Sequence, residues 1–175
     1  MPKRLQIFPE KCIGCRSCEL ACSLANDQEL NPDRTRISVV SFTDANQGLP
    51  YHLPLTCRQC ADAPCLESCP AGAIRRSKDS LKAVLIDYEH CTQCGQCVTA
   101  CPFGAIYFDE HRQLPFKCGL CSGEPACVAL CPAEAITFVE QRPFLARPHA
   151  LNLKAFALLR DGQQKKGLPS GSPQQ

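Results

Sequence analysis

The sequence predicts an α+β fold, in which short strands and short helices are arranged around four groups of cysteines. The 175 residues contain sixteen cysteines, which fall into four quartets along the chain. Three of the quartets run into the related sequences CPAGAI, CPFGAI and CPAEAI. In each repeat we expect a short helix that ends at the proline, then a turn, and then a small apolar strand beginning at the Ala-Ile pair.

The elements expected between the quartets are short. In the first half of the chain they are a strand over 4–8, a helix after Cys18, a β-branched strand over 36–42 and a loop over 44–50. Further along they are strands over 73–75 and 81–88 around a turn at 76–80, strands over 105–108 and 135–139, and a loop through His111 and Pro115. At the C-terminus we expect an amphipathic helix over 151–160 and a mobile tail over 161–175, which is rich in Gly, Pro, Ser, Gln and Lys.

The third quartet carries the most specific motif. It reads CTQCGQCVTACP from Cys91 to Pro102, and this C-x2-C-x2-C-x3-C-P run is typical of 4Fe-4S proteins in which the fourth cysteine serves a second cluster. Three thiolates surround one face of a cubane, and the fourth lies one helical turn further on, so it can reach a different cubane. Quartets must therefore exchange their last cysteines in pairs, and four quartets predict four 4Fe-4S clusters.

The other quartets vary this pattern. The first consists of Cys12, Cys15, Cys18 and Cys22, the second of Cys57, Cys60, Cys65 and Cys69, the third of Cys91, Cys94, Cys97 and Cys101, and the fourth of Cys118, Cys121, Cys127 and Cys131. The first differs from the rest because Ser23 follows its last cysteine where the others have proline, and because a longer helix is expected there.

Two other uses of cysteine compete with this prediction. Isolated pairs such as Cys57–Cys60 or Cys118–Cys121 would suit a zinc ribbon. A third cysteine two residues later and the repeated Cys-Pro ending fit zinc badly. A disulfide scaffold would suit a secreted protein, and the opening MPKRLQIFPEK has no apolar leader segment. No quartet position is replaced, so a three-iron cluster is not expected.

Composition argues against several other functions. The formal charge is +2, and four oxidised clusters with their thiolates would lower it to roughly −6. Basic side chains near the quartets then compensate local charge and do not indicate nucleic-acid binding. No apolar run approaches the roughly 20 residues of a membrane span, so we expect a cytoplasmic protein without a membrane anchor. The scattered histidines His52, His90, His111 and His149, and the lack of a glycine-rich phosphate loop, indicate no catalytic residues.

The order and spacing of all four quartets resemble the four-cluster ferredoxin-type subunits. The resemblance includes the CRQCADAPC segment and the wider Cys121–Cys127 spacing, and it extends over residues 5–139. Such subunits accompany dimethyl-sulfoxide reductase, formate dehydrogenase and formate hydrogenlyase, and similar small polyferredoxins accompany tungsten-dependent aldehyde oxidoreductases. The resemblance implies two ferredoxin-like units, the inner one nested in the outer. The outer unit would comprise 1–50 and 110–147, the inner unit 51–109, and a C-terminal helix and flexible tail would follow over 148–175.

The resemblance also implies how the quartets pair, outer with outer and inner with inner. The implied ligand sets are Cys12, Cys15, Cys18 and Cys131; Cys118, Cys121, Cys127 and Cys22; Cys57, Cys60, Cys65 and Cys101; and Cys91, Cys94, Cys97 and Cys69. Cys22 lacks a following proline, which sets it apart from the other three last cysteines, Cys69, Cys101 and Cys131.

These features predict a non-catalytic electron-transfer subunit. We expect it to relay electrons between a tungsten- or molybdenum-pterin catalytic subunit, such as an aldehyde oxidoreductase, and a second redox subunit that could carry flavin. The alternatives are an accessory maturation ferredoxin and a free diffusible polyferredoxin. The C-terminal helix either folds back on its own domain or docks on a partner or on a second copy of the chain.

Overall fold

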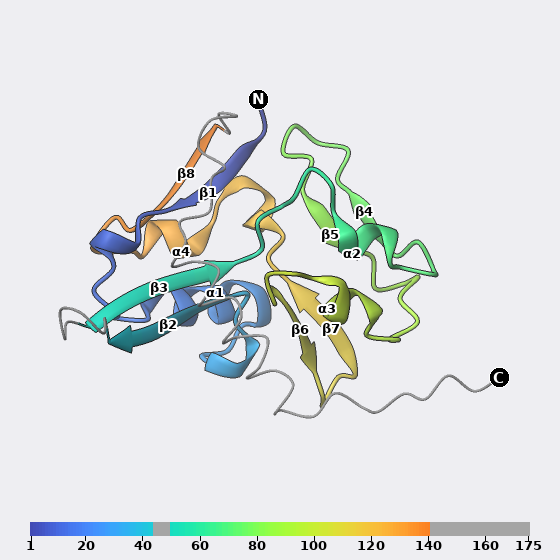
Figure 1. Ribbon diagram of the computed structural model, residues 1–175, viewed down its shortest axis with the longest axis horizontal. Coiled ribbons are helices and arrows are strands. Elements are labelled where there is room, and N and C mark those ends of the chain that lie inside the picture. Colours follow the sequence, from blue (N-terminus) through green and yellow to red (C-terminus); the bar gives the residue numbers. More distant parts are fainter. Residues whose placement is uncertain (44–49, 141–175) are drawn as a thin grey trace.

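The computed structural model describes residues 1–43 and 50–140, and within them the strands form four separate antiparallel pairs (Figure 1). β1 (Lys3–Ile7) pairs with β8 (Ile136–Glu140), and β2 (Ile37–Thr43) pairs with β3 (Pro50–Thr56). β4 (Ile74–Arg76) pairs with β5 (Val84–Ile86), and β6 (Ile106–Asp109) pairs with β7 (Leu114–Lys117).

Four α-helices and three 3-10 turns separate these strands. The α-helices are α1 (Ser17–Asp27), α2 (Pro64–Glu67), α3 (Gln96–Ala100) and α4 (Ala126–Ala129). The 3-10 turns are η1 (Pro9–Lys11), η2 (Pro32–Arg34) and η3 (Leu120–Gly123). None of the helices in the described residues is long and apolar enough to cross a membrane.

Elements that are far apart in sequence meet. The first strand pairs with the last, from Lys3 opposite Glu140 to Ile7 opposite Ile136, and α1 packs against α4. In the middle of the chain α2 packs against α3. Figure 1 shows β1, β8, α1 and α4 gathered on one side of the molecule, with α2, α3, β4 and β5 on the other. The fold is thus an α+β arrangement compatible with the ferredoxin-like class.

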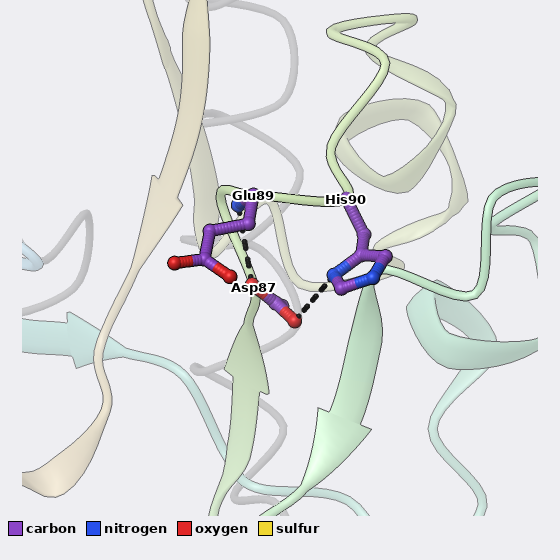
Figure 2. A group of neighbouring side chains, drawn as sticks. All are labelled: Asp87, Glu89 and His90. Atoms are coloured by element: carbon purple, nitrogen blue, oxygen red, sulfur yellow. Dashed lines mark hydrogen bonds and ion pairs between the residues drawn. The ribbon is translucent and has the colours of Figure 1, made fainter.

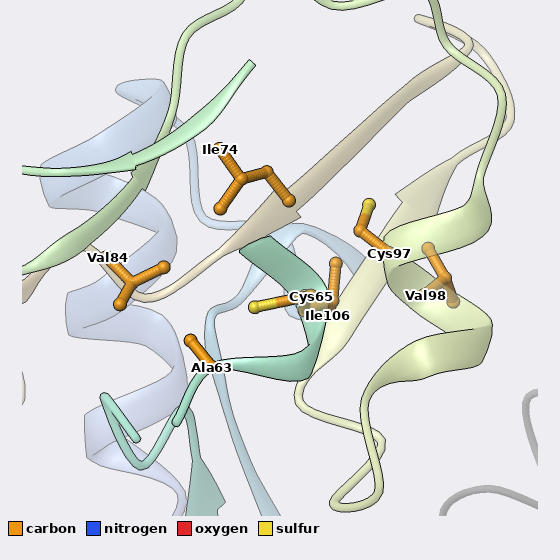
Figure 3. Packing of buried hydrophobic residues seen from close by; sticks show 7 residues of the cluster. All are labelled: Ala63, Cys65, Ile74, Val84, Cys97, Val98 and Ile106. Carbon is orange, nitrogen blue, oxygen red and sulfur yellow. The ribbon is translucent and has the colours of Figure 1, made fainter. Parts of the chain in front are cut away.

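Cysteines form part of the hydrophobic core. One buried cluster, shown in Figure 3, comprises Ala63, Cys65, Ile74, Val84, Cys97, Val98 and Ile106. Ile106 at its centre is fully buried. A second buried cluster comprises Cys18, Cys22, Ile37, Val39, Cys127 and Ile136. Because apolar side chains surround the sulfur atoms, the same packing that stabilises the fold also excludes water from the thiols.

The CP repeats have the predicted form. Each of α2, α3 and α4 ends just before a Cys-Pro pair, and β4, β6 and β8 each begin at the isoleucine of the repeat. The turn between them needs a left-handed residue, with φ of 61° at Gly72, 57° at Gly104 and 49° at Glu134. Glu134 therefore adopts a conformation that favours glycine. In the first quartet the expected longer helix, α1, contains Cys18 and Cys22 and continues to Asp27.

Two strands, β3 and β7, were not predicted. β3 begins at Pro50, the last residue of the loop expected over 44–50, whose residues 44–49 lie outside the described residues, and β7 replaces the expected loop through Pro115. Both sequences contain proline, which argues against a central strand. In a two-stranded sheet each strand is an edge strand, so proline can face away from the partner's hydrogen-bonding groups. The strand expected over 81–88 is also shorter, Val84–Ile86, and Arg76 belongs to β4 and not to the turn. The helix and tail expected over 148–175 lie outside the described residues.

Asp27, at the C-terminal end of α1, joins this helix to two other parts of the molecule. Its buried carboxylate accepts hydrogen bonds from Arg36, just before β2, and from Arg112, in the β6–β7 turn, at 2.6 Å from the latter. Burial alone would raise the pKa of Asp27, but the hydrogen bonds from Arg36 and Arg112 outweigh it and lower the pKa below its ordinary value. The carboxylate is therefore charged at neutral pH and stabilises this junction.

We predict that Asp27→Asn lowers the free energy of unfolding by about 1–3 kcal/mol at pH 7, because two buried charged hydrogen bonds are weakened. The folded-state pKa lies below 3.8, so the stabilisation is present above that pH and is lost as the pH falls through the folded-state value. Anaerobic denaturant titration of the cluster-loaded protein measures the effect. Glu29→Gln, which weakens a more exposed pair with Arg34, is the matched control. Equal stability of both variants would contradict the role of Asp27.

Candidate metal centres

One cavity has four cysteines in its wall. Three belong to the second quartet and one to the third; they are Cys57, Cys60, Cys65 and Cys101. Cys65 lies in α2, and Cys101 directly follows α3, so the contact between these two helices brings the two quartets together. Val84 and Ile106 complete an apolar wall.

A second cavity is built in the same way from the first and fourth quartets. Its cysteines are Cys22, Cys118, Cys121 and Cys127. Cys22 lies in α1 and Cys127 in α4, and these two helices pack together. In both cavities the structure therefore brings together three cysteines of one quartet and the last cysteine of another.

Among the other eight cysteines, the charges of some raise the pKa of others, which shows that they lie near one another. Burial raises the pKa of Cys18 to about 12, and negative charge at Glu19, Cys12, Cys15 and Cys131 raises it further. Burial likewise raises the pKa of Cys97 to about 12, with added contributions from Cys91, Cys94 and Cys65. Cys69 packs against the buried cluster that contains Cys97.

The thiols have the properties that a metal cluster requires. None of the sixteen cysteines forms a disulfide, and Cys18, Cys22, Cys65, Cys97, Cys118 and Cys127 are buried. Burial raises the pKa of Cys127 strongly and that of Cys118 to about 11. Groups of buried thiolates repel one another unless a metal neutralises them. Four soft sulfur donors around an apolar cavity fit an iron–sulfur cluster, which supplies one-electron oxidation and reduction when bound.

Backbone amides point at the last sulfur of every quartet. Ala73, Ala105 and Ala135 donate their amide protons to Cys69, Cys101 and Cys131, at 3.2, 3.4 and 3.2 Å respectively. The alanine is the same residue of each CP repeat, four positions after the cysteine. Such donors stabilise sulfur charge and help set a cluster's potential.

Cys22, which has no following proline, obtains its donors differently. The amide of Arg36, fourteen residues away, donates to the Cys22 sulfur at 3.2 Å. The side chain of Asn26 lies 3.7 Å from the same sulfur. Sequence reasoning missed the contribution of Arg36, because the contact depends on how β2 packs beside α1.

Two buried polar side chains connect the two cavities. Lys117 donates to the carbonyls of Val84 and Cys118, the latter at 2.9 Å. Gln59 donates to the Cys118 carbonyl at 2.8 Å and accepts from the Val84 amide at 2.7 Å. Lys117 is only 7% exposed, so its charge is held inside the protein. Its positive charge lowers the pKa values that burial raises at Cys65 and Cys101.

The group formed by Asp87, Glu89 and His90 lies in the turn just before the third quartet (Figure 2). Asp87 accepts from the Glu89 amide at 3.1 Å and lies 2.8 Å from the His90 ring nitrogen. It also pairs with Arg75, which balances its charge. The arrangement is that of a capped turn, which fixes the chain where it enters the Cys91 loop. His149 lies outside the described residues.

His52 lies against the first cluster loop. It belongs to β3 and hydrogen-bonds to Ser41 across the hairpin at 2.8 Å. A side-chain carbon at Gly14 would lie only 2.7 Å from two atoms of the His52 ring. Gly14 is thus needed both for its φ of 71° and for this close approach, and the β2–β3 hairpin supports the loop between Cys12 and Cys15.

Comparison with known proteins decides the family. The model of the 4Fe-4S dicluster domain matches residues 49–141, and that of a 4Fe-4S binding domain matches residues 5–23. The chain belongs to the 4Fe-4S dicluster domain family. Its predicted resemblance to the iron–sulfur subunits is thereby confirmed, and 4Fe-4S clusters, in place of zinc, are its cofactor.

Relatives of this dicluster protein include electron-transfer subunits. It is 37% identical over 121 residues to the polyferredoxin-like subunit of an aliphatic sulfonate oxidoreductase from Pyrococcus furiosus. The aligned residues make up 69% of this chain and 66% of that subunit. It is 36% identical to the formate dehydrogenase iron–sulfur subunit of Wolinella succinogenes, over 66% of this chain and 58% of that subunit. It is 39% identical to the electron transport protein HydN of Escherichia coli, over 55% of this chain and 54% of that protein. The chain thus spans just over half to about two thirds of the length of these relatives.

We predict that Gly14→Ala impairs cluster assembly at the first loop, because the new carbon meets the His52 ring in addition to the cost of a positive φ. Gly95→Ala is the matched control: its φ of 70° is nearly the same, it also lies in a cluster loop, and nothing approaches its added carbon within 4 Å. Iron content and visible absorption after anaerobic purification measure the difference, and His52→Ala should partly restore the Gly14→Ala protein. Equal losses in both glycine variants would show that only backbone strain matters.

Proposed function

We propose that the protein holds four 4Fe-4S clusters in two nested dicluster units and conducts electrons between two redox partners. The observation that carries this proposal is the composition of the two cavities, in each of which a distant quartet supplies the fourth cysteine. The proposed ligand sets are Cys12, Cys15, Cys18 and Cys131; Cys118, Cys121, Cys127 and Cys22; Cys57, Cys60, Cys65 and Cys101; and Cys91, Cys94, Cys97 and Cys69. The proposed outer unit is 1–50 with 110–147, and the inner unit is 51–109.

Electrostatic interactions between the proposed ligand sets support an arrangement of the four clusters in a linear series. Cys18 of the first set is among the charges that raise the pKa of the buried Cys127 in the second. Cys57 of the third set acts in the same way on the buried Cys118 of the second. Cys65 of the third set acts on the buried Cys97 of the fourth. Each set thus neighbours the next, and the order runs from the Cys12 loop to the Cys91 loop.

The two ends of this series reach the surface. Cys15, in the first set, and Cys94, in the last, are the two exposed cysteines, whereas every other one is at least partly buried. Electron transfer between proteins requires an outer cluster close to the surface, and a buried interior protects the intervening ones. One partner would therefore dock at the Cys12–Cys15 loop and the other at the Cys91–Cys94 loop.

For the partners, we propose a catalytic subunit of the tungsten- or molybdenum-pterin class, with aldehyde oxidoreductase as a specific candidate, and a second redox subunit that carries flavin. Relatives named as subunits of formate dehydrogenase and of a sulfonate oxidoreductase support a role within an oxidoreductase complex. This chain itself supplies ligands, spacing and insulation and no catalytic residue. The accessory maturation ferredoxin and the free polyferredoxin are the competing proposals, and the C-terminal helix is proposed as a further docking element, for a partner or a second copy.

We predict that anaerobic purification from the native source yields a brown protein with about sixteen irons per chain, four for each cluster. We also expect a catalytic subunit to co-purify, with tungsten or molybdenum detected beside iron by elemental analysis. A loaded chain that purifies alone would instead favour a free carrier. Zinc in place of iron would contradict the proposal as a whole.

We predict that Cys101→Ser damages the cluster held by Cys57, Cys60 and Cys65 more than the cluster of its own loop. Cys69→Ser is the reciprocal variant and should damage the cluster held by Cys91, Cys94 and Cys97. Electron paramagnetic resonance during a redox titration distinguishes the clusters by their midpoint potentials. If each variant instead lost the cluster of its own quartet, the exchanged ligand sets would be wrong.

A further inference from the structure

The Tyr107 ring is held in place within the β6–β7 hairpin. Tyr107 lies in β6 opposite Phe116 of β7, and the two rings stack with centroids 5.5 Å apart. The guanidinium of Arg36 lies 5.2 Å from the Phe116 ring centroid, and the Arg36 amide donates to Cys22. The aromatic pair of the β6–β7 hairpin therefore packs against Arg36, the residue whose amide serves Cys22.

The Tyr107 hydroxyl has no partner among the described residues. The residue as a whole is half-buried, but its hydroxyl oxygen is buried and makes no hydrogen bond. An unsatisfied buried hydroxyl is costly, and buried polar groups in native proteins nearly always have a partner. A bound group that accepts a hydrogen bond would remove this cost.

The surroundings of the hydroxyl indicate what that group is. Burial raises the pKa of Tyr107, and the charges that raise it further are, in order, those of Cys22, Glu19, Cys101 and Cys118. The phenol therefore stays protonated and is available as a donor. Glu19 is already used by the Val39 amide, at 2.5 Å, and by Arg16, at 3.2 Å. The other three charged groups are cysteines: Cys22 and Cys118 line the second cavity, and Cys101 lines the first.

We propose that Tyr107 donates its hydroxyl proton to a sulfur of the 4Fe-4S cluster held by Cys22, Cys118, Cys121 and Cys127. This inference rests on the proposed ligand sets. The Tyr107 ring stacks on Phe116, whose ring lies against Arg36, and Arg36, Cys22 and Cys118 all line the second cavity, so this cluster is the one assigned. A hydrogen bond to sulfur stabilises the reduced, more negative cluster more than the oxidised one and so raises its reduction potential. Tyr107 would thereby help to set the reduction potential of one inner cluster of the proposed series.

The test is Tyr107→Phe in the full-length, cluster-loaded protein, since this change keeps the ring and its stacking but removes the hydroxyl. A redox titration followed by electron paramagnetic resonance should show one cluster at a lower potential and the other three unchanged. We expect the ratio of reduced to oxidised cluster at a fixed potential to fall about tenfold, which is about 59 mV for a one-electron couple. The affected cluster should be the one lost in Cys127→Ser. Tyr88→Phe is the matched control, because Tyr88 is 50% exposed and water can satisfy its hydroxyl.

A second measurement keeps the test decisive if Tyr107→Phe assembles poorly. Replacing the tyrosines with 3-fluorotyrosine leaves each hydroxyl in place but makes it a stronger donor, so the potential of the same cluster should rise. Unchanged potentials in a protein with about sixteen irons would overturn the role of Tyr107, and a shift confined to the Cys57, Cys60, Cys65 and Cys101 cluster would overturn the assignment. A wild-type protein with clearly fewer irons would instead contradict the proposed function, so the two failures are distinguishable.

Discussion

One constraint dominates this structure. A metal cluster needs four sulfurs around it, and one loop can offer only three. Both cavities have three cysteines from one quartet and a fourth from another. The pairing of β1 with β8, the packing of α1 on α4 and the packing of α2 on α3 all bring distant quartets together. Because the cysteines are also core residues, fold and cofactor binding are expected to be mutually dependent, as for other metal sites whose ligands meet only in the folded chain.

Protein groups around the thiols balance a large negative charge in an apolar interior. Three last cysteines receive the amide of the alanine in the CP repeat, and Cys22 receives that of Arg36. Lys117 is a buried cation that donates to one wall residue of each cavity, Val84 and Cys118. The same carbonyl, that of Cys118, accepts from both Lys117 and Gln59, so the polar contacts between the cavities form one network. Differences among these donors give each proposed cluster its own electrostatic surroundings, and hence the means to hold a different potential.

A relay of this kind requires order along its length and access at its ends. The proposed sets neighbour one another in sequence from the Cys12 loop to the Cys91 loop, and only Cys15 and Cys94 are exposed. The supports of the two terminal loops differ. The Cys12–Cys15 loop packs under His52 at Gly14, whereas the Cys91 loop is entered through the capped turn at Asp87. A protein that distinguishes an electron donor from an electron acceptor needs two different docking surfaces, and the two terminal loops differ in this way.

The sequence determined the cofactor, the type of its ligands and the repeated helix–turn–strand unit, because these depend on cysteine spacing and on local backbone chemistry at each Cys-Pro. It also predicted most strands to within a few residues. It did not reveal β3 and β7, since proline argues against a strand unless the strand is known to lie at an edge. The meeting of two quartets at each cavity, the donor to Cys22, the burial of Lys117 and the unpaired hydroxyl of Tyr107 were decided only by tertiary structure. Each of these depends on which segments far apart in the chain come into contact, and local sequence does not encode that.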